Sequence, residues 1–315
     1  MESNPLVTLG IVCYNHEKYL SDCFKSVLKQ DYQNLEVIIN DDCSRDSSVS
    51  VIESYVLRLK ERFINVKFIK NSRNQGVCKS VNNVIRNSKG KYIKLLASDD
   101  IMLPNCISAL VGFMNVNKDK LICFSNGYII DDKYRYGDRL GYRKINRDNF
   151  NLDRVDLFER LMRGNFINTV GVLIDRSIFQ KYGLFDETLG YEDHEMWLRL
   201  SRYESFGYIN QCLIGYRRAE TSLTNINTKN GKRKLLFMLQ SEKDVIKKYL
   251  KYIKKEKRKY YISAYYNRGL RGLLNYHYYY MSYLWLRTMI KKNISFERDI
   301  IEKIESLGFW KRLFL

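Results

Sequence analysis

Adjacent carboxylates end one apolar stretch of the sequence and could bind a metal ion. The segment Lys91–Ala97 has the pattern of a strand buried on both faces, and Asp99 and Asp100 follow it after Ser98. Two carboxylates at the tip of an interior strand suit a hard divalent cation that bridges to phosphate. The alternative is an acidic turn that leads into the helix expected after Pro104.

Two other strand ends carry polar groups of a kind that binds nucleotides. Tyr14 follows the apolar run Val7–Cys13, and Asp41-Asp42 follows the apolar run Leu35–Ile39. An aromatic ring can stack on a base, and a carboxylate can accept hydrogen bonds from a base or a ribose. Helix capping is the competing explanation for the nearby Asp46, but not for the aspartate pair.

A third acidic pair, Glu192-Asp193, opens a predicted helix over Glu192–Arg202. Carboxylates are common in a first helical turn because the helix dipole favours them, so the pair alone does not establish catalysis. We interpret the neighbouring His194 as a bystander. Trp197 could belong to the core or to the floor of an acceptor site, and its helical spacing from other apolar residues favours the core.

Strands and helices alternate four times before residue 100. The predicted strands are 7–13, 35–39, 66–69 and 91–97, and the predicted helices are 17–29, 49–62 and 77–87. Such alternation implies right-handed crossovers and a mostly parallel sheet flanked by helices, an α/β fold. The ends of the first, second and fourth strands should therefore lie at one edge.

Composition and missing motifs exclude several classes of protein. The chain has 315 residues, 45% of them hydrophobic, which is enough for a full core. Neither G-x-G-x-x-G nor G-x-x-x-x-G-K-[ST] follows the first strand, so a dinucleotide-dependent dehydrogenase and a P-loop NTPase are disfavoured. Seven scattered cysteines without C-x-x-C pairs indicate reduced thiols in a cytoplasm, and no apolar run is long enough to span a bilayer.

Several of these segments together resemble the inverting family-2 glycosyltransferases of the GT-A fold. The resemblance covers residues 6–220. It rests on Tyr14-Asn15, the Asp-Asp-x-Ser run 41–44, Asn74-Gln75-Gly76, the Ser98-Asp99-Asp100 region and the Glu192-Asp193 motif. One departure is Ala97, which stands where the family has the first Asp of its Asp-x-Asp motif.

The resemblance implies roles for individual residues. Asp193 would be the catalytic base, with Glu192 and Trp197 on the acceptor side. Tyr14, Asp42, Asp99, Asp100 and Arg217 would bind the donor, and Asp99 with Asp100 would hold Mn²⁺ or Mg²⁺. The donor would be a nucleotide-diphosphate sugar, most commonly a UDP-sugar. The acceptor would be a glycan or lipid-linked glycan in bacterial surface-polysaccharide synthesis, such as O-antigen or capsule.

The C-terminal part of the chain differs in composition from the rest. We expect a catalytic domain over residues 1–228, with a nucleotide-sugar half to about residue 100 and an acceptor half from 101, and a basic, Tyr-rich helical region over 229–315. Residues 231–315 contain 21 Lys and Arg against 7 Asp and Glu, so +14 of the net +19 lies there. An apolar stripe beside lysines is typical of a helix on an anionic membrane, and equally of a helical layer with a solvated lysine face.

Two other functional classes stay open at this point. A sugar-phosphate nucleotidyltransferase would also bind a nucleotide on an α/β sheet, but it would need a glycine-rich loop where Tyr14-Asn15-His16 stands. A nucleic-acid-binding protein would also be basic, yet no RNA- or DNA-binding motif is present, so no nucleic-acid partner is expected.

Overall fold

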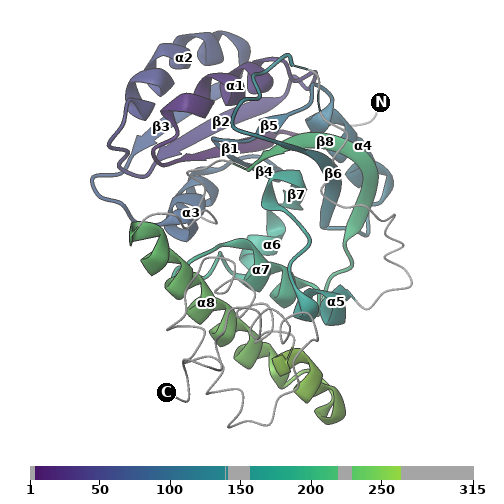
Figure 1. The fold of residues 1–315 in the computed structure, drawn as a ribbon. Helices are drawn as coiled ribbons and strands as arrows, with labels where there is room; N and C mark the ends of the chain where they lie inside the picture. The colour runs from purple at the N-terminus through teal and green to yellow at the C-terminus, as the bar shows by residue number, and fades with distance from the viewer. Residues whose placement is uncertain (1–3, 139, 141–156, 219–228, 264–315) are drawn as a thin grey trace. The chain divides into compact units, whose positions relative to one another are not determined.

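A computed structural model describes residues 4–138, 140, 157–218 and 229–263 (Figure 1). The chain divides into two compact units. The first comprises Met1–Leu161 and Asn165–Ser222, and the second comprises Met162–Gly164 and Leu223–Leu315. All the site residues predicted from the sequence belong to the first unit. The predicted domain boundary after residue 228 and the donor and acceptor halves stay predictions.

The first unit begins with the predicted alternation of strands and helices. Its elements are β1 (Val7–Cys13), α1 (Glu17–Leu28), β2 (Leu35–Asp41), α2 (Ser48–Arg62), β3 (Asn65–Lys70), α3 (Val77–Asn87) and β4 (Tyr92–Ala97). These four strands pair in parallel in the order β3-β2-β1-β4. The α/β fold and its mostly parallel arrangement are confirmed.

The second half of the unit extends the same sheet. It contains β5 (Ile101–Met102), α4 (Cys106–Val116), β6 (Ile122–Ile130), α5 (Leu157–Arg163), the 3-10 turn η2 (Thr169–Gly171), β7 (Val172–Asp175), α6 (Ser177–Tyr182), α7 (Asp193–Leu200) and β8 (Gly207–Arg217). The full strand order is β3-β2-β1-β4-β7-β6-β8-β5, and β7 runs antiparallel to both of its neighbours.

Two strands are longer than the sequence pattern indicated. The polar sequence of residues 126–149 predicts a long loop or an irregular hairpin, and the apolar pattern predicts a strand only over Cys212–Gly215. In the structure β6 continues to Ile130 and β8 begins at Gly207. The reason is that β6 and β8 pair in parallel along most of their length, with irregular register near Asn126. Backbone pairing between distant segments therefore holds residues in strands although their own polarity favours a loop.

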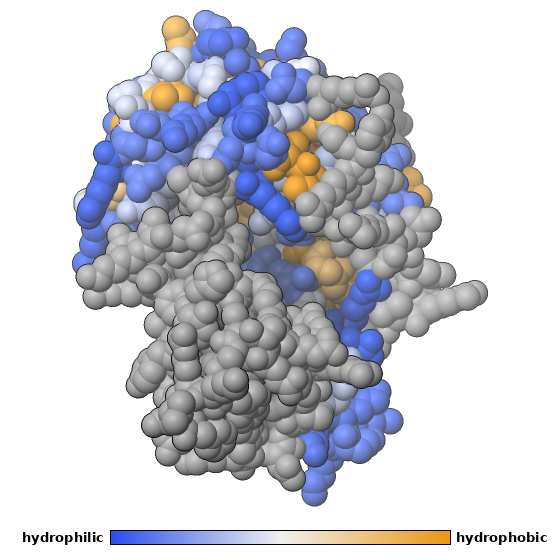
Figure 2. Space-filling model, viewed as in Figure 1, coloured by the Kyte–Doolittle hydropathy of each residue, from blue (hydrophilic) through white to orange (hydrophobic). Residues whose placement is uncertain are grey.

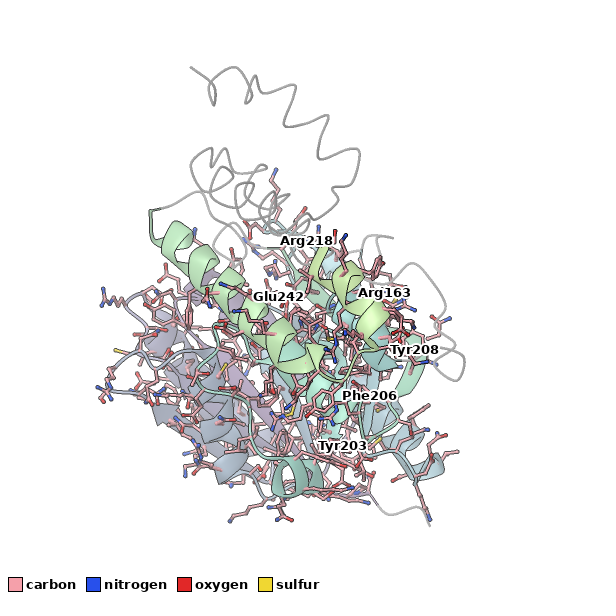
Figure 3. The ribbon with its side chains drawn as sticks, turned by 90° about the horizontal axis from the view of Figure 1, so that it is seen from below. Arg163, Tyr203, Phe206, Tyr208, Arg218 and Glu242 are labelled. Carbon is pink, nitrogen blue, oxygen red and sulfur yellow. The ribbon has the colours of Figure 1, made fainter. Side chains whose placement is uncertain are left out.

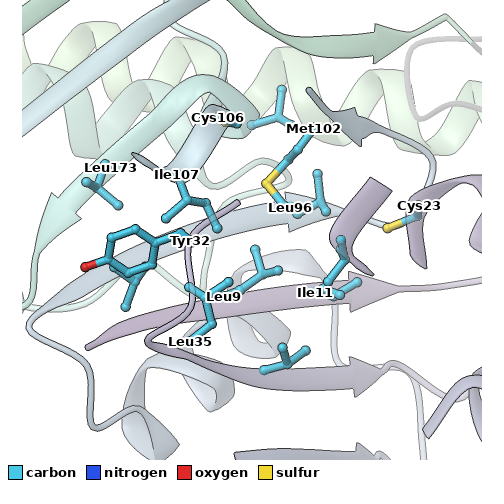
Figure 4. Close-up of a cluster of buried hydrophobic side chains, with 14 of the residues drawn as sticks. Leu9, Ile11, Cys23, Tyr32, Leu35, Leu96, Met102, Cys106, Ile107 and Leu173 are labelled. Carbon is cyan, nitrogen blue, oxygen red and sulfur yellow. The ribbon is translucent and has the colours of Figure 1, made fainter. Parts of the chain in front are cut away.

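Helices cover both faces of the sheet, and one glycine allows a close approach. Side chains of β1, β2 and β4 that point to one face pack against α1, α2 and α4 in a continuous hydrophobic cluster (Figure 4). On the opposite face, α3 packs against β1 and β2. A Cβ atom at Gly10 of β1 would lie 2.3 Å from Val84 of α3, so only glycine fits there. The outer face of α2, at the top of Figure 2, is mostly hydrophilic.

The second unit contains α8 (Lys229–Leu250). An apolar stripe of this segment is buried and consists of Val245, Ile246, Tyr249 and Ile253. The neighbouring lysines are exposed, namely Lys247, Lys248, Lys251, Lys254 and Lys255. The membrane-surface helix and the packed helical layer both stay predictions. Among the residues that the structure describes, no helix is both long and apolar enough to cross a bilayer.

Candidate active site

The strand register brings the three predicted strand ends together. Cys13 at the end of β1 lies opposite Asp41 at the end of β2, and Val12 lies opposite Ala97 at the end of β4. Tyr14 and Asp42 therefore follow neighbouring strands at the same edge of the sheet, and the turn with Asp99 lies at the same edge. This is the edge where open α/β sheets place their ligands.

The loops after β1 and β2 are joined by hydrogen bonds that position Tyr14. Asn15 adopts a left-handed conformation with φ of 56°, which asparagine tolerates better than most residues. Its backbone N–H donates to Ser44 Oγ at 2.9 Å, and its side-chain oxygen accepts the N–H of Arg45 at 2.7 Å. Tyr14 itself is half-buried, and its stacking on a base stays a prediction.

Asp42 orders the loop in front of α3. Its Oδ1 accepts the N–H of Gln75 and the amide of Asn71, both at 2.8 Å, and its Oδ2 accepts the N–H of Gly76 at 2.8 Å. The residue is 4% exposed. The structure thus gives Asp42 a role in holding the 71–76 loop, and its direct contact with a donor stays a prediction.

Asp99 is the more accessible carboxylate of its pair. It is half-buried, and its Oδ1 lies 3.8 Å from His16 Nδ1. The same ring nitrogen is hydrogen-bonded to Ser98 Oγ at 2.8 Å. We did not single out His16 from the sequence, although its place directly after Tyr14-Asn15 put it at the same strand end. The histidine fixes the turn that carries Asp99.

Asp100 and Arg217 are both buried. Asp100 is 3% exposed, and its Oδ1 accepts the backbone N–H of Arg217 at 2.7 Å. Burial, reinforced by Asp99, raises the pKa of Asp100 well above its usual range. The Arg217 side chain is also fully buried and donates to protein oxygens. The contacts of the Arg217 side chain are thus with protein oxygens, and its contact with the donor stays a prediction. Of the two aspartates, the half-buried Asp99 is the better-placed candidate metal ligand.

The acidic pair at the start of α7 is held by the segment 165–169. Asn165 Nδ2 donates to Asp193 Oδ2 at 2.6 Å, and Thr169 Oγ1 donates to Glu192 Oε1 at 3.2 Å. Asp193 Oδ1 also accepts the N–H of His194 at 2.7 Å. Burial raises the pKa of Asp193, and burial followed by the charge of Asp193 raises the pKa of Glu192 to about 7. A carboxylate with a raised pKa is a stronger base, as proton abstraction requires.

Trp197 and His194 belong to the core. The Trp197 side chain is fully buried, its Nε1 donates to the carbonyl of Ile167 at 3.1 Å, and its ring makes edge contacts with Phe185 and Phe206, the latter labelled in Figure 3. This burial fits the core interpretation of Trp197 that its helical spacing favoured, and its placement on the acceptor side stays a prediction. His194 is 3% exposed and its Nε2 bonds the carbonyl of Leu161, which supports its role as a bystander.

The Tyr216 side chain lies near enough to the Asp99-Asp100 turn and to Asp193 to be affected by the charges of both. This half-buried residue of β8 has a raised pKa, chiefly because of burial and further because of Asp100, Asp99 and Asp193. One hydroxyl group thus lies within the electrostatic reach of both the Asp99-Asp100 turn and Asp193. The Asp99-Asp100 turn and Asp193 therefore both act electrostatically on one side chain of the first unit.

Comparison with known proteins identifies the family. Residues 8–183, more than half of the chain, match the sequence profile described as Glycosyl transferase family 2. The chain belongs to glycosyl transferase family 2. An uncharacterized glycosyltransferase of Rickettsia prowazekii, RP339, is 29% identical over 227 residues, which are 71% of this chain and 68% of that protein. The putative colanic acid biosynthesis glycosyl transferase WcaA of Escherichia coli is 32% identical over 129 residues, 41% of this chain and 45% of that protein.

Solved structures confirm the fold of this family-2 chain. TarS residues 1–349 of S. aureus in complex with UDP-GlcNAc align with a TM-score of 0.54 and 15% identity, over 85% of this chain and 81% of that one. The mannosyltransferase PcManGT of Pyrobaculum calidifontis, in complex with GDP-Man and Mn²⁺, aligns with a TM-score of 0.58 and 10% identity, over 96% and 79%. The predicted GT-A fold is therefore confirmed, and family membership decides against the nucleotidyltransferase and nucleic-acid-binding alternatives.

The carboxylate oxygens of Asp99 are suitable ligands for the divalent cation that membership of this family implies. Among the described residues, no cluster of three or more His, Cys, Asp or Glu side chains could enclose a metal ion. Mg²⁺ and similar ions are often bound by one or two carboxylates, with water and substrate phosphates at the other positions. Asp99 is half-buried at a strand end, so it fits a site in which water and phosphate supply the other metal ligands.

The raised pKa of Glu192 predicts a pH-dependent change in stability. A carboxyl group whose pKa rises from 4.5 to about 7 on folding binds its proton more tightly in the folded state, so its contribution to stability falls as the pH rises through this window. Glu192→Gln should therefore raise Tm by a few degrees at pH 8 and leave it unchanged at pH 4.5, measured by differential scanning fluorimetry. The exposed Glu61, changed to Gln, is the matched control. An equal shift at both pH values would contradict the prediction.

Proposed function

We propose that this family-2 enzyme transfers a sugar from a nucleotide-diphosphate sugar, preferably a UDP-sugar, to an acceptor hydroxyl with inversion at the anomeric carbon. The observation that supports the proposal is the match of residues 8–183 to glycosyl transferase family 2, together with the strand register that brings the residues after β1, β2 and β4 to one edge of the sheet. A metal-binding carboxylate and a general base that face the same space can act on the leaving group and on the acceptor of one transfer.

Asp193 acts as the base in this proposal. It accepts the proton of the acceptor hydroxyl as that oxygen attacks the anomeric carbon from the face opposite the leaving diphosphate. The bonds from Asn165 and the His194 N–H fix the orientation of its carboxylate, so no reorientation is needed at the moment of transfer. Glu192 lies on the acceptor side, where it holds a proton below about pH 7 and avoids a second negative charge beside Asp193.

The donor binds at the carboxyl edge of β1, β2 and β4. Tyr14 stacks on the base, Asp42 orders the loop that borders the nucleotide, and Asp99 ligates Mn²⁺ or Mg²⁺, with Asp100 as a second predicted ligand. When bound, the metal ion supplies positive charge that offsets the charge developing on the diphosphate. TarS in complex with UDP-GlcNAc supports a UDP-sugar, and PcManGT in complex with GDP-Man and Mn²⁺ supports metal use.

The acceptor is proposed to be a glycan or a lipid-linked glycan in bacterial polysaccharide biosynthesis. Support comes from the similarity to WcaA, whose name assigns it to colanic acid biosynthesis. O-antigen or capsule is the product class that we propose for this chain, and the added unit would be a hexose or an N-acetylhexosamine.

A donor panel tests the proposed function. The purified protein is incubated with UDP-, GDP- and dTDP-sugars in the presence and absence of Mn²⁺, and release of nucleoside diphosphate is measured. Slow, metal-dependent hydrolysis of one UDP-sugar is the expected result, because water can replace the acceptor. Release from GDP-mannose alone would overturn the choice of UDP, and the absence of release and of binding across the panel would overturn the proposed function.

We further propose that the protein is cytoplasmic and associates peripherally with the anionic inner face of the cell membrane. The support is the exposed lysine face of the second unit, Lys247, Lys248, Lys251, Lys254 and Lys255. Each lysine near anionic lipid contributes about 1 kcal/mol, and salt screens this attraction. Because the apolar stripe is buried, the attraction should be purely electrostatic.

Liposome co-sedimentation tests this attraction. The protein should pellet with anionic vesicles at low salt and remain in solution at high salt. Changing the five lysines to Gln should abolish pelleting, whereas changing the same five to Arg should preserve it. If the Gln variant pellets like the wild type, the lysine face does not bind membranes.

A further inference from the structure

Arg217 occupies the centre of a buried hydrogen-bond network. Its Nε donates to the carbonyl of Asp99 at 2.8 Å, and its Nη1 donates to the carbonyls of Asp131 at 2.6 Å and Tyr134 at 3.0 Å. Its Nη2 lies 3.4 Å from the carboxylate of Asp22, which is itself 3% exposed. Four of the five N–H donors of a guanidinium are thus directed at protein oxygens.

The same residue holds both members of the acidic turn. Its side chain binds the carbonyl of Asp99, and its backbone N–H binds Oδ1 of Asp100. These two bonds fix the turn between β4 and β5 from the side of β8. The direction of the Asp99 carboxylate therefore depends on Arg217, although the two side chains are not paired.

Residues 131–138, which we call the strap, follow β6 and are fastened to α1 beside Arg217. Tyr19 Oη donates to Asp132 Oδ1 at 2.7 Å, and the N–H of Tyr136 donates to Asp22 Oδ1 at 2.9 Å. The guanidinium also lies 4.9 Å from the centre of the Tyr19 ring and 5.7 Å from that of Tyr134. One buried cation thus contacts the strap, α1 and the acidic turn.

We propose that Arg217 is a positioning residue that couples the strap to the metal-binding turn, so that affinity for a metal–nucleotide complex depends on the strap being fastened. The proposal rests on the proposed function, because it takes Asp99 as the metal ligand. The physical reason is that a buried guanidinium must keep its acceptors. Loss of the strap carbonyls leaves charged donors unpaired and shifts the Arg217 side chain, which the turn then follows. By linkage, a ligand that binds the ordered turn also stabilises the strap.

Hydrogen exchange and calorimetry on the full chain test this coupling. The wild type is titrated with Mn²⁺ and UDP, and with Mn²⁺ and GDP, and backbone exchange in residues 131–138 is measured with and without the complex that binds. Exchange in the strap should slow several-fold on binding. Tyr19→Phe removes only the hydroxyl that bonds Asp132, and it should speed exchange in the strap and weaken metal–nucleotide binding about three- to tenfold.

Further variants separate positioning from direct contact. Asp22→Asn should act like Tyr19→Phe, and Arg217→Met should weaken binding more than tenfold. Arg218→Met, at the exposed neighbouring residue labelled in Figure 3, is the matched control and should change neither readout. Because Tyr19→Phe and Asp22→Asn keep Arg217 in place, they test the coupling even if Arg217→Met fails to fold.

Three other results would contradict the coupling, and each has a different meaning. Faster strap exchange in Tyr19→Phe with unchanged affinity would show that the strap and the turn are independent. Weaker binding in Arg217→Met with unchanged strap exchange would show that Arg217 contacts the nucleotide directly. If the wild type bound neither metal–nucleotide pair, the proposed function would fail, and the coupling with it.

Discussion

Asp193→Asn should lower the turnover of the transfer by about 10²- to 10⁴-fold, the range that a general base contributes. Asparagine keeps the size of the side chain, and its one carbonyl oxygen can still accept the His194 N–H, whereas its amide nitrogen cannot accept the bond from Asn165. Asp193 is half-buried at the start of α7, so the loss of this one bond should leave the fold intact. What is lost is the ability to take the proton from the acceptor hydroxyl. Turnover is measured with the donor that the panel identifies, and donor affinity is measured by calorimetry.

Donor affinity distinguishes a base from a binding residue. If Asp193 is the base, kcat falls while the Kd of the nucleotide-sugar stays nearly unchanged. Asp175→Asn is the matched control, because Asp175 pairs with Tyr92 at the opposite end of β4 and accepts bonds from Ser177. Equal losses of affinity and rate in Asp193→Asn would instead make Asp193 a donor-binding residue.

Asp99→Ala should abolish metal-dependent binding of the nucleotide and reduce transfer by about 10²-fold or more, because a metal ion provides several kcal/mol of charge stabilisation. The side chain lies at a strand end and is half-buried, so its removal should leave the core intact. Binding is measured by titrating Mn²⁺ in the presence of UDP, and the fold is checked by circular dichroism.

The exposed Asp119, which pairs with Lys120, provides the control for this change. Asp119→Ala should leave Mn²⁺-dependent binding unaltered. Asp100→Asn adds a second comparison, because Asp100, the second predicted ligand, is buried and bonded to Arg217, whereas Asp99 is half-buried. If Asp99→Ala kept full metal-dependent binding while Asp100→Asn lost it, the metal assignment would move to Asp100.

The sequence determined the fold and the place of the site. Apolar runs and helical spacing are local, so they marked the strands and helices up to Ala97 within about two residues of their observed bounds. Parallel pairing then brings the ends of β1, β2 and β4 to one edge, and residue order alone placed Tyr14, Asp42 and Asp99 there. The adjacent carboxylates Glu192 and Asp193 at the start of a helix were likewise visible as a local sequence pattern.

Only the tertiary structure decided what the neighbouring polar groups do. Arg217 meets Asp22 and Asp131 across separations of 195 and 86 residues, and no local pattern reports such a contact. Asp42 likewise turns its carboxylate toward the loop before α3, and Trp197 is enclosed by rings from Phe185 and Phe206. Side-chain direction at a strand end or a helix start is set by long-range packing and by the need to satisfy buried charges. Periodicity indicates where a residue stands, and the packed fold decides whether it faces a ligand or the protein.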